Sequence, residues 1–135
     1  INTFNVRTAA VNGANDIGHI ETLLRFCTAG GCDVIGLQER NRDGTSDIVS
    51  SGYRVFFSGD CSGVEGRKGQ HGVGLAIKEE IVKKAGEDGV IIECISARLL
   101  KARVSIKSNF VTFMVAYAPT EEAPEGQKAK CMAAL

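Results

Sequence analysis

The segment Asp33-Val34-Ile35-Gly36-Leu37-Gln38-Glu39 constrains the fold of this chain most, because its apolar run ends abruptly in an amide and a carboxylate. A short apolar run without polar alternation is typical of a strand that is buried on both faces of a sheet. The rim of such a sheet is a common place for a catalytic or metal-binding carboxylate in α/β proteins. The sequence therefore predicts a buried strand over residues 33–38, with Glu39 at its tip.

Two further apolar segments end in polar side chains that could share this rim. Asn5 lies in the segment Thr3-Phe4-Asn5-Val6-Arg7-Thr8, and Tyr117 lies in Val115-Ala116-Tyr117-Ala118-Pro119-Thr120. We expect the three strand ends to meet in one pocket, although they are far apart along the chain. If Asn5, Glu39 and Tyr117 lay on different faces or edges, the functional interpretation below would fail.

Alternating, apolar and helical patterns along the chain predict about seven strands and two or three helices. Polar residues without periodicity predict a loop over residues 40–51, and glycines predict an exposed loop over 58–70. We expect the most apolar strand, residues 110–117, to lie at the centre of its sheet. The fold class is therefore α/β or α+β, a sandwich with helices outside the sheets. The expected strands are 2–9, 33–38, 53–57, 72–77, 90–95, 99–107 and 110–117, and the expected helices are 17–28, 78–84 and 126–135.

Size and charge limit the domain organisation and the mode of binding. A chain of 135 residues is one domain or part of one. It begins with Ile1 almost inside a strand pattern and ends with Leu135 inside a helical one, so we expect a piece of a longer protein. Sixteen basic and sixteen acidic residues give a net charge of zero. Binding of nucleic acid would therefore depend on local geometry rather than on bulk charge.

The cysteines indicate the redox compartment. There are five, with no CxxC pair, a pattern typical of reduced, intracellular thiols. Cys27, Cys32 and Cys94 fall among apolar neighbours, which predicts that they pack in the core. No apolar run approaches the ~20 residues of a membrane helix. We expect an intracellular location, nuclear or cytoplasmic, with no membrane partner.

Five short segments together resemble the endonuclease/exonuclease/phosphatase superfamily, which has the DNase I-like fold. They occur in the family's order and at about its spacing, and within the superfamily they are most similar to the endonuclease domain of RTE-like non-LTR retrotransposons. Each segment alone is a weak signal, whereas five in order are a strong one. The segments are Phe4–Thr8, Val34–Glu39, Gly52–Gly59, His71–Ala76 and Tyr117–Thr120.

The resemblance implies a four-layer sandwich of two mixed β-sheets flanked by helices. It also implies a hydrolase that cuts a DNA phosphodiester with a divalent ion, Mg²⁺ or Mn²⁺. On this resemblance Asn5 matches the first-strand Asn of the active site, Glu39 the metal-binding Glu, and Tyr117 the Tyr that contacts the scissile phosphate. These residue types suit their tasks, because Mg²⁺ prefers oxygen ligands and a phenol can donate to a phosphate oxygen.

The sequence also departs from the family pattern. Phe4 stands where the family usually has Trp, which removes an indole N–H beside Asn5. The Gly-Asp-Phe-Asn-like and Ser-Asp-His-like motifs, which supply the general base and catalytic His in the family, do not occur. We therefore expect residues 1–135 to be the N-terminal half of the domain and to be inactive or nearly so alone. A reverse transcriptase domain in the same parent chain is a further expectation.

Several alternatives remain open at this stage. Arg40 and Arg42 follow Glu39 and are expected either to contact substrate phosphates or to lie in a solvated loop. His71 is read as a loop histidine before a strand. The substrate could instead be a phosphoinositide or another phosphoester of the same superfamily. The chain could also be a non-catalytic remnant or an interaction module, because half a sandwich leaves an open sheet edge and exposed apolar surface.

Overall fold

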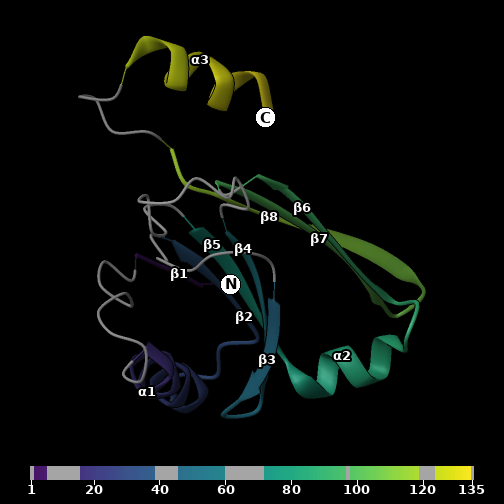
Figure 1. Ribbon diagram of the computed structural model, residues 1–135. Coiled ribbons are helices and arrows are strands. Elements are labelled where there is room, and N and C mark those ends of the chain that lie inside the picture. The colour runs from purple at the N-terminus through teal and green to yellow at the C-terminus, as the bar shows by residue number, and fades with distance from the viewer. Residues whose placement is uncertain are drawn as a thin grey trace.

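Two β-sheets face each other in the computed structural model, which describes residues 2–5, 16–38, 46–59, 72–96, 98–118 and 124–134 (Figure 1). The first sheet has the order β1-β2-β5-β4-β3, formed by Asn2–Asn5, Val34–Gln38, Gly72–Lys78, Tyr53–Gly59 and Ser46–Ser50. The second has the order β6-β7-β8, formed by Val90–Ser96, Leu99–Ile106 and Asn109–Ala116. The helices are α1 (Asp16–Ala29), α2 (Glu79–Ala85) and α3 (Glu125–Ala134).

The first helix forms as its apolar spacing predicts. Ile20, Leu24 and Cys27 recur at helical spacing and are buried against the first sheet. Glu21 and Arg25 pair on the exposed side with 2.6 Å between Oε1 and Nη2. Because β1 and β2 on either side of α1 are parallel, the strand–helix–strand opening is a βαβ unit.

The strand β2 is buried on both faces, which confirms the expectation from its apolar run. Ile35 and Leu37 pack against α1. Val34 lies on the other face, in a cluster that joins Leu75 of the first sheet to Leu100 of the second. Two separate apolar clusters thus lie on the two sides of the first sheet, which is the middle layer of an α/β/β arrangement. The expected α+β sandwich is the observed fold class.

The prediction of a loop over residues 40–51 is wrong for the second part of this range, which forms a strand. Ser46–Ser50 form β3, an edge strand that pairs antiparallel with β4 through a two-residue turn at Ser51 and Gly52. Both turn residues have positive φ, 50° and 80°, as in the primed turns that match the twist of a hairpin. The strand holds only Ile48 and Val49 as apolar residues, too few for alternation to be recognised, and hairpin pairing rather than its own pattern stabilises it.

The prediction that the most apolar strand lies at the centre of its sheet is also wrong for the described residues. That strand, β8, pairs only with β7 in the described sheet and lies at its edge. Phe110, Val111 and Met114 are exposed, and Val115 alone in this strand is fully buried. Apolar composition therefore did not indicate burial on both faces here. Cys94 on β6 is likewise exposed rather than in the core.

Helix α2 closes one end of the sandwich. Ile81, Val82 and Ala85 pack against the apolar cluster between the sheets. The helix directly follows β5, which runs antiparallel to β2. It therefore lies at the end of the first sheet where β2 begins, and the opposite end, where β2 finishes at Gln38, is left clear of α2. None of the helices in the described ranges is both long and apolar enough to span a bilayer.

Candidate functional site

The carboxyl ends of β1 and β2 lie side by side at one edge of the first sheet. The two strands are parallel, and their register pairs Asn5 with Gln38. The same row continues across the sheet through Val73 on β5 to Ser58 on β4. Parallel neighbours end at the same edge, so the backbone of Asn5 is adjacent to the strand that leads directly into Glu39.

Two side-chain hydrogen bonds join the second sheet to this edge. Gln38 Nε2 donates to the carbonyl oxygen of Ala116 at 3.3 Å, and Ser58 Oγ donates to the carbonyl oxygen of Ser96 at 2.7 Å. Ser58 is only 2% exposed, and a buried hydroxyl needs such a partner. The end of β2 therefore contacts the end of β8, and Tyr117 is the residue that follows the contact.

Tyr117 is held by Arg98, a residue that the sequence analysis did not single out. The Tyr117 N–H donates to the Arg98 carbonyl at 2.8 Å, and Arg98 Nη1 donates to the Tyr117 carbonyl at 3.3 Å. The guanidinium carbon also lies 5.0 Å from the centre of the Tyr117 ring, within the range of a cation–π contact. The half-buried phenol thus has a permanent positive charge beside it, an arrangement that favours anionic ligands.

The three predicted site residues are placed to different extents. The backbones of Asn5 and Tyr117 are described. Asn5 is paired with Gln38 in the sheet, and Tyr117 follows Ala116, whose carbonyl accepts the hydrogen bond from Gln38. Glu39, Arg40 and Arg42 lie outside the described residues. Their roles, and the roles of Asn5 and Tyr117, stay predictions. The strand ends that carry the motifs nevertheless meet at one edge of the molecule.

The residue types at this edge fit a hard divalent ion. Asn5, Gln38 and Glu39 offer amide and carboxylate oxygens, the donors that Mg²⁺ and Mn²⁺ prefer. Within the described ranges there is no group of three or more His, Cys, Asp or Glu residues that could hold a metal. A site here would therefore depend on Glu39 together with amide oxygens, waters and substrate.

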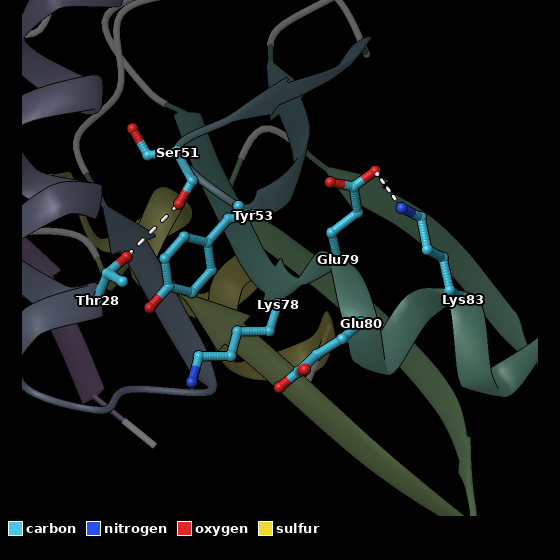
Figure 2. A pocket seen from close by; sticks show the side chains of 8 residues that line it. Thr28, Ser51, Tyr53, Lys78, Glu79, Glu80 and Lys83 are labelled. Atoms are coloured by element: carbon cyan, nitrogen blue, oxygen red, sulfur yellow. Dashed lines mark hydrogen bonds and ion pairs between the residues drawn. The ribbon is translucent and has the colours of Figure 1, made fainter.

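A shallow hollow of about 420 Å³ lies at the opposite edge of the first sheet (Figure 2). Its two lysines are paired with carboxylates: Lys78 Nζ is 3.1 Å from Asp33 Oδ1, and Lys83 Nζ is 3.4 Å from Glu79 Oε1. The hydrogen bond to Asp33 is the main cause that raises the pKa of Lys78. No predicted site residue that the structure describes lines this hollow. Its lining is Thr28, Ser51, Gly52, Tyr53, Lys78, Glu79, Glu80 and Lys83.

Comparison with known families gives one match that covers most of the chain. The model of the Endonuclease/Exonuclease/phosphatase family matches residues 3–130. This range includes β2 to β8 and all of β1 except Asn2, and with them the three strand ends described above. None of the curated protein sequences matches the chain.

Two solved structures match most of this chain. The AP endonuclease LMAP from Leishmania major has a TM-score of 0.62 at 16% identity, and the match covers 96% of this chain and 43% of the enzyme. An endonuclease/exonuclease/phosphatase family protein from Leptotrichia buccalis has a TM-score of 0.49 at 15% identity, covering 97% of this chain and 60% of that protein. The chain thus spans less than half the length of the Leishmania enzyme, and at this identity the likeness shows the fold.

Proposed function

Because the chain belongs to the endonuclease/exonuclease/phosphatase family, we propose that it forms part of a Mg²⁺- or Mn²⁺-dependent DNA endonuclease, of the kind carried by RTE-like retrotransposons. The family comprises nucleases and phosphatases that generally use divalent ions. One observation carries the proposal: the hydrogen bond from Gln38 to Ala116, which brings the end of β2 to the end of β8. It supports a common location for Glu39 and Tyr117.

Each proposed role follows from the chemistry of the side chain. Glu39 and Asn5 would hold the ion through oxygen atoms. When bound, the ion would withdraw charge from the phosphate and stabilise the leaving oxygen. The Tyr117 hydroxyl would donate to a non-bridging phosphate oxygen as negative charge develops. Arg98, stacked on that ring, would add a fixed positive charge beside the same phosphate.

The phosphates next to the scissile bond would be bound by basic side chains. Arg40 and Arg42 follow Glu39 in the sequence, and contacts to flanking phosphates fix the register of a nuclease on its strand. Since the net charge of the chain is zero, such local contacts rather than bulk attraction would hold the DNA.

The proposed activity needs groups that these 135 residues do not supply. The sequence has neither a Gly-Asp-Phe-Asn-like nor a Ser-Asp-His-like motif, and the general base and catalytic His of the family therefore have no counterpart in it. We propose that the 135 residues bind the ion and contact phosphate, but cut DNA very slowly or not at all without those groups.

Ion binding by the isolated chain tests the site separately from catalysis. We would titrate the chain with Mn²⁺ and follow the free ion by electron paramagnetic resonance. The Glu39→Gln variant should bind at least ~10–100-fold more weakly, because even the loss of an outer-shell partner of a metal ligand typically lowers affinity by that factor. Glu93→Gln is the matched control, because Glu93 is exposed and pairs with Lys101 at 3.6 Å on the second sheet. Equal affinity in Glu39→Gln and the unmodified chain would contradict the proposed ligand.

A nicking assay on supercoiled plasmid in Mg²⁺ tests the claim of missing groups. We expect little or no conversion to open circles by the 135 residues. Robust cutting that disappears in Glu39→Ala would refute the claim of incompleteness while supporting the nuclease. Release of phosphate from inositol phospholipids, without cutting of DNA, would favour the phosphoinositide-phosphatase alternative.

The proposed retrotransposon origin has a genomic test. An open reading frame that continues with a Gly-Asp-Phe-Asn motif and then a reverse transcriptase would support it. A continuation into a phosphatase-like or unrelated domain, without reverse transcriptase, would oppose it.

A second candidate function is a non-catalytic remnant that associates with a second copy of itself. The observation that favours it is the outward face of the second sheet, where Ile91, Phe110 and Met114 are each about half exposed. Apolar side chains that are exposed on one face of a sheet favour association. Light scattering across a range of concentrations distinguishes a self-associating remnant from a monomeric nuclease domain. A monomer that also unfolds cooperatively would count against the remnant.

A further inference from the structure

Helix α1 ends in a turn that places two cysteines against each other. The Cys32 N–H donates to the Cys27 carbonyl and the Gly31 N–H donates to the Thr28 carbonyl, each at 3.0 Å. Gly31 between them has a φ of 70°. These are the two hydrogen bonds and the left-handed glycine of a Schellman motif, in which the residue after the glycine packs on the last helical turn. The two residues in that contact are Cys32 and Cys27.

The surroundings of the two thiols support direct contact. Cys27 is 1% exposed within the first apolar cluster, and half-buried Cys32 packs against the same cluster. A methyl group placed on Gly30 would lie 3.8 Å from Cys32 Sγ and 3.6 Å from the Cys27 carbonyl oxygen, so the Cys32 thiol folds back over the helix end. Burial raises the pKa of the Cys27 thiol, and the charge of Cys32 and a hydrogen bond between the two thiols raise it further.

We propose that Cys27 and Cys32 are a redox-active pair that forms a reversible disulfide, with a low-molecular-weight disulfide such as glutathione disulfide as the oxidant. Neither thiol is in a disulfide in the structure. A disulfide needs Cα atoms ~4.4–6.8 Å apart. The 3.0 Å backbone hydrogen bond holds the backbones of the two residues close together, and the Cys32 thiol lies over the helix end that carries Cys27. This inference is independent of the proposed hydrolase, because it involves neither the metal-binding nor the phosphate-binding groups.

The two thiols have different parts in the reaction. The Cys32 thiol is the more exposed, so it loses its proton to solvent, attacks the oxidant and releases one glutathione thiolate. Cys27 then loses its proton and attacks Cys32 Sγ, which forms the internal bridge and releases the second thiolate. The chain gives up two electrons and two protons, and the oxidant becomes two thiols. Burial of Cys27 slows attack by reagents from outside but not attack on a neighbour already in contact.

The bridge would act on the segment between α1 and β2. The Cys32 carbonyl accepts a hydrogen bond from the hydroxyl of Tyr53, which is fully buried, and β2 begins two residues later at Val34. Oxidation would tie the helix end to the strand that leads to Glu39. Because a disulfide restricts the unfolded chain, the oxidised form should melt at a higher temperature than the reduced form.

Peptide mapping tests the proposal directly. Cleavage after Arg25 and Arg40 gives a tryptic peptide, residues 26–40, that contains Cys27 and Cys32 and no other cysteine. After equilibration of the native chain with glutathione disulfide, acid quenching and alkylation, this peptide should be two hydrogen atoms lighter and carry no alkyl group. A peptide with two alkylated thiols, or with a stable glutathione adduct, would overturn the proposal.

Three variants separate the pair from its surroundings. In Cys27→Ala the attacking thiol is gone, so Cys32 should retain one glutathione. In Cys32→Ser the buried Cys27 should stay reduced. This variant tests which thiol attacks the oxidant first, even if Cys27→Ala fails to fold. Cys94→Ser is the control, because Cys94 is exposed and lies outside the pair, and the bridge should form unchanged. A lower melting temperature for the oxidised unmodified chain would contradict the claim that the native turn accommodates the bridge.

Discussion

Gly74 in the middle of β5 offers a stability test of the packing beside the candidate site. It pairs with Leu37 on one side and with Phe57 on the other, and it is buried. A Cβ added to Gly74 would lie 2.9 and 3.1 Å from two carbons of the Phe57 ring and 3.3 Å from the Phe56 carbonyl oxygen. The Gly74→Ala variant therefore needs movement of a ring that is itself only 2% exposed.

The expected cost follows from two opposing effects. Overpacking a close-packed core costs ~1–3 kcal/mol, and the Phe57 ring cannot move outward without opening the cluster under α1. Replacing a glycine within a strand restores ~0.5–1 kcal/mol, because alanine loses less backbone entropy on folding. The difference is ~0–2.5 kcal/mol, and from the middle of this range we expect Gly74→Ala to lower the free energy of unfolding by about 1 kcal/mol.

Urea unfolding followed by circular dichroism measures this loss, since the chain has no tryptophan for fluorescence. Gly126→Ala in α3 is the control, because no atom lies within 4 Å of the added Cβ, and it should be neutral or slightly stabilising. A cycle with Phe57→Leu should show coupling on the order of 1 kcal/mol between the two sites. A neutral Gly74→Ala, or strictly additive effects in the double variant, would refute the proposed clash.

Three further predictions concern single groups. Tyr53→Phe removes the hydrogen bond to the Cys32 carbonyl and should cost ~0.5–1.5 kcal/mol, seen as a lower urea midpoint; an unchanged midpoint would contradict it. Burial raises the pKa of the Cys27 thiol, so its contribution to stability is complete below the unfolded pKa of ~8.5 and falls as pH rises above it. In Cys27→Ala the free energy of unfolding should fall less steeply as pH rises. An identical pH dependence in the variant and the unmodified chain would argue against the raised pKa of Cys27. Met114→Lys should reduce the binding of a hydrophobic dye to the second sheet, where Met114 is 51% exposed; equal dye binding would exclude this face as the site.

Local patterns predicted the elements whose burial is decided by their own sequence. The apolar spacing of α1 and the two-sided burial of β2 were both predicted correctly, because α1 presents one apolar stripe and β2 is apolar throughout. The polar strand β3 was missed because hairpin pairing with β4, not its own composition, stabilises it. The position of β8 was wrong because apolar composition does not specify which neighbours a strand has.

The candidate site shows the same limit. The motifs drew attention to three segments of the chain, but no pattern in the sequence fixes the register that pairs Asn5 with Gln38. Nor does it predict the hydrogen bond from Gln38 to Ala116, which are 78 residues apart. Arg98 was missed because a single basic residue before a strand carries no signal until the chain places it over Tyr117. Long-range contacts of this kind depend on the packing of whole sheets.

The most direct test of the account is the broadening of backbone amide signals by Mn²⁺ in the nuclear magnetic resonance spectrum of the chain. The account predicts selective broadening at the ends of β1, β2 and β8, near Asn5, Gln38 and Tyr117, with little effect at Lys83 beside the opposite edge. The Glu39→Gln variant should lose this pattern. Broadening confined to the opposite edge, or an unchanged pattern in Glu39→Gln, would contradict a shared ion site at the three strand ends.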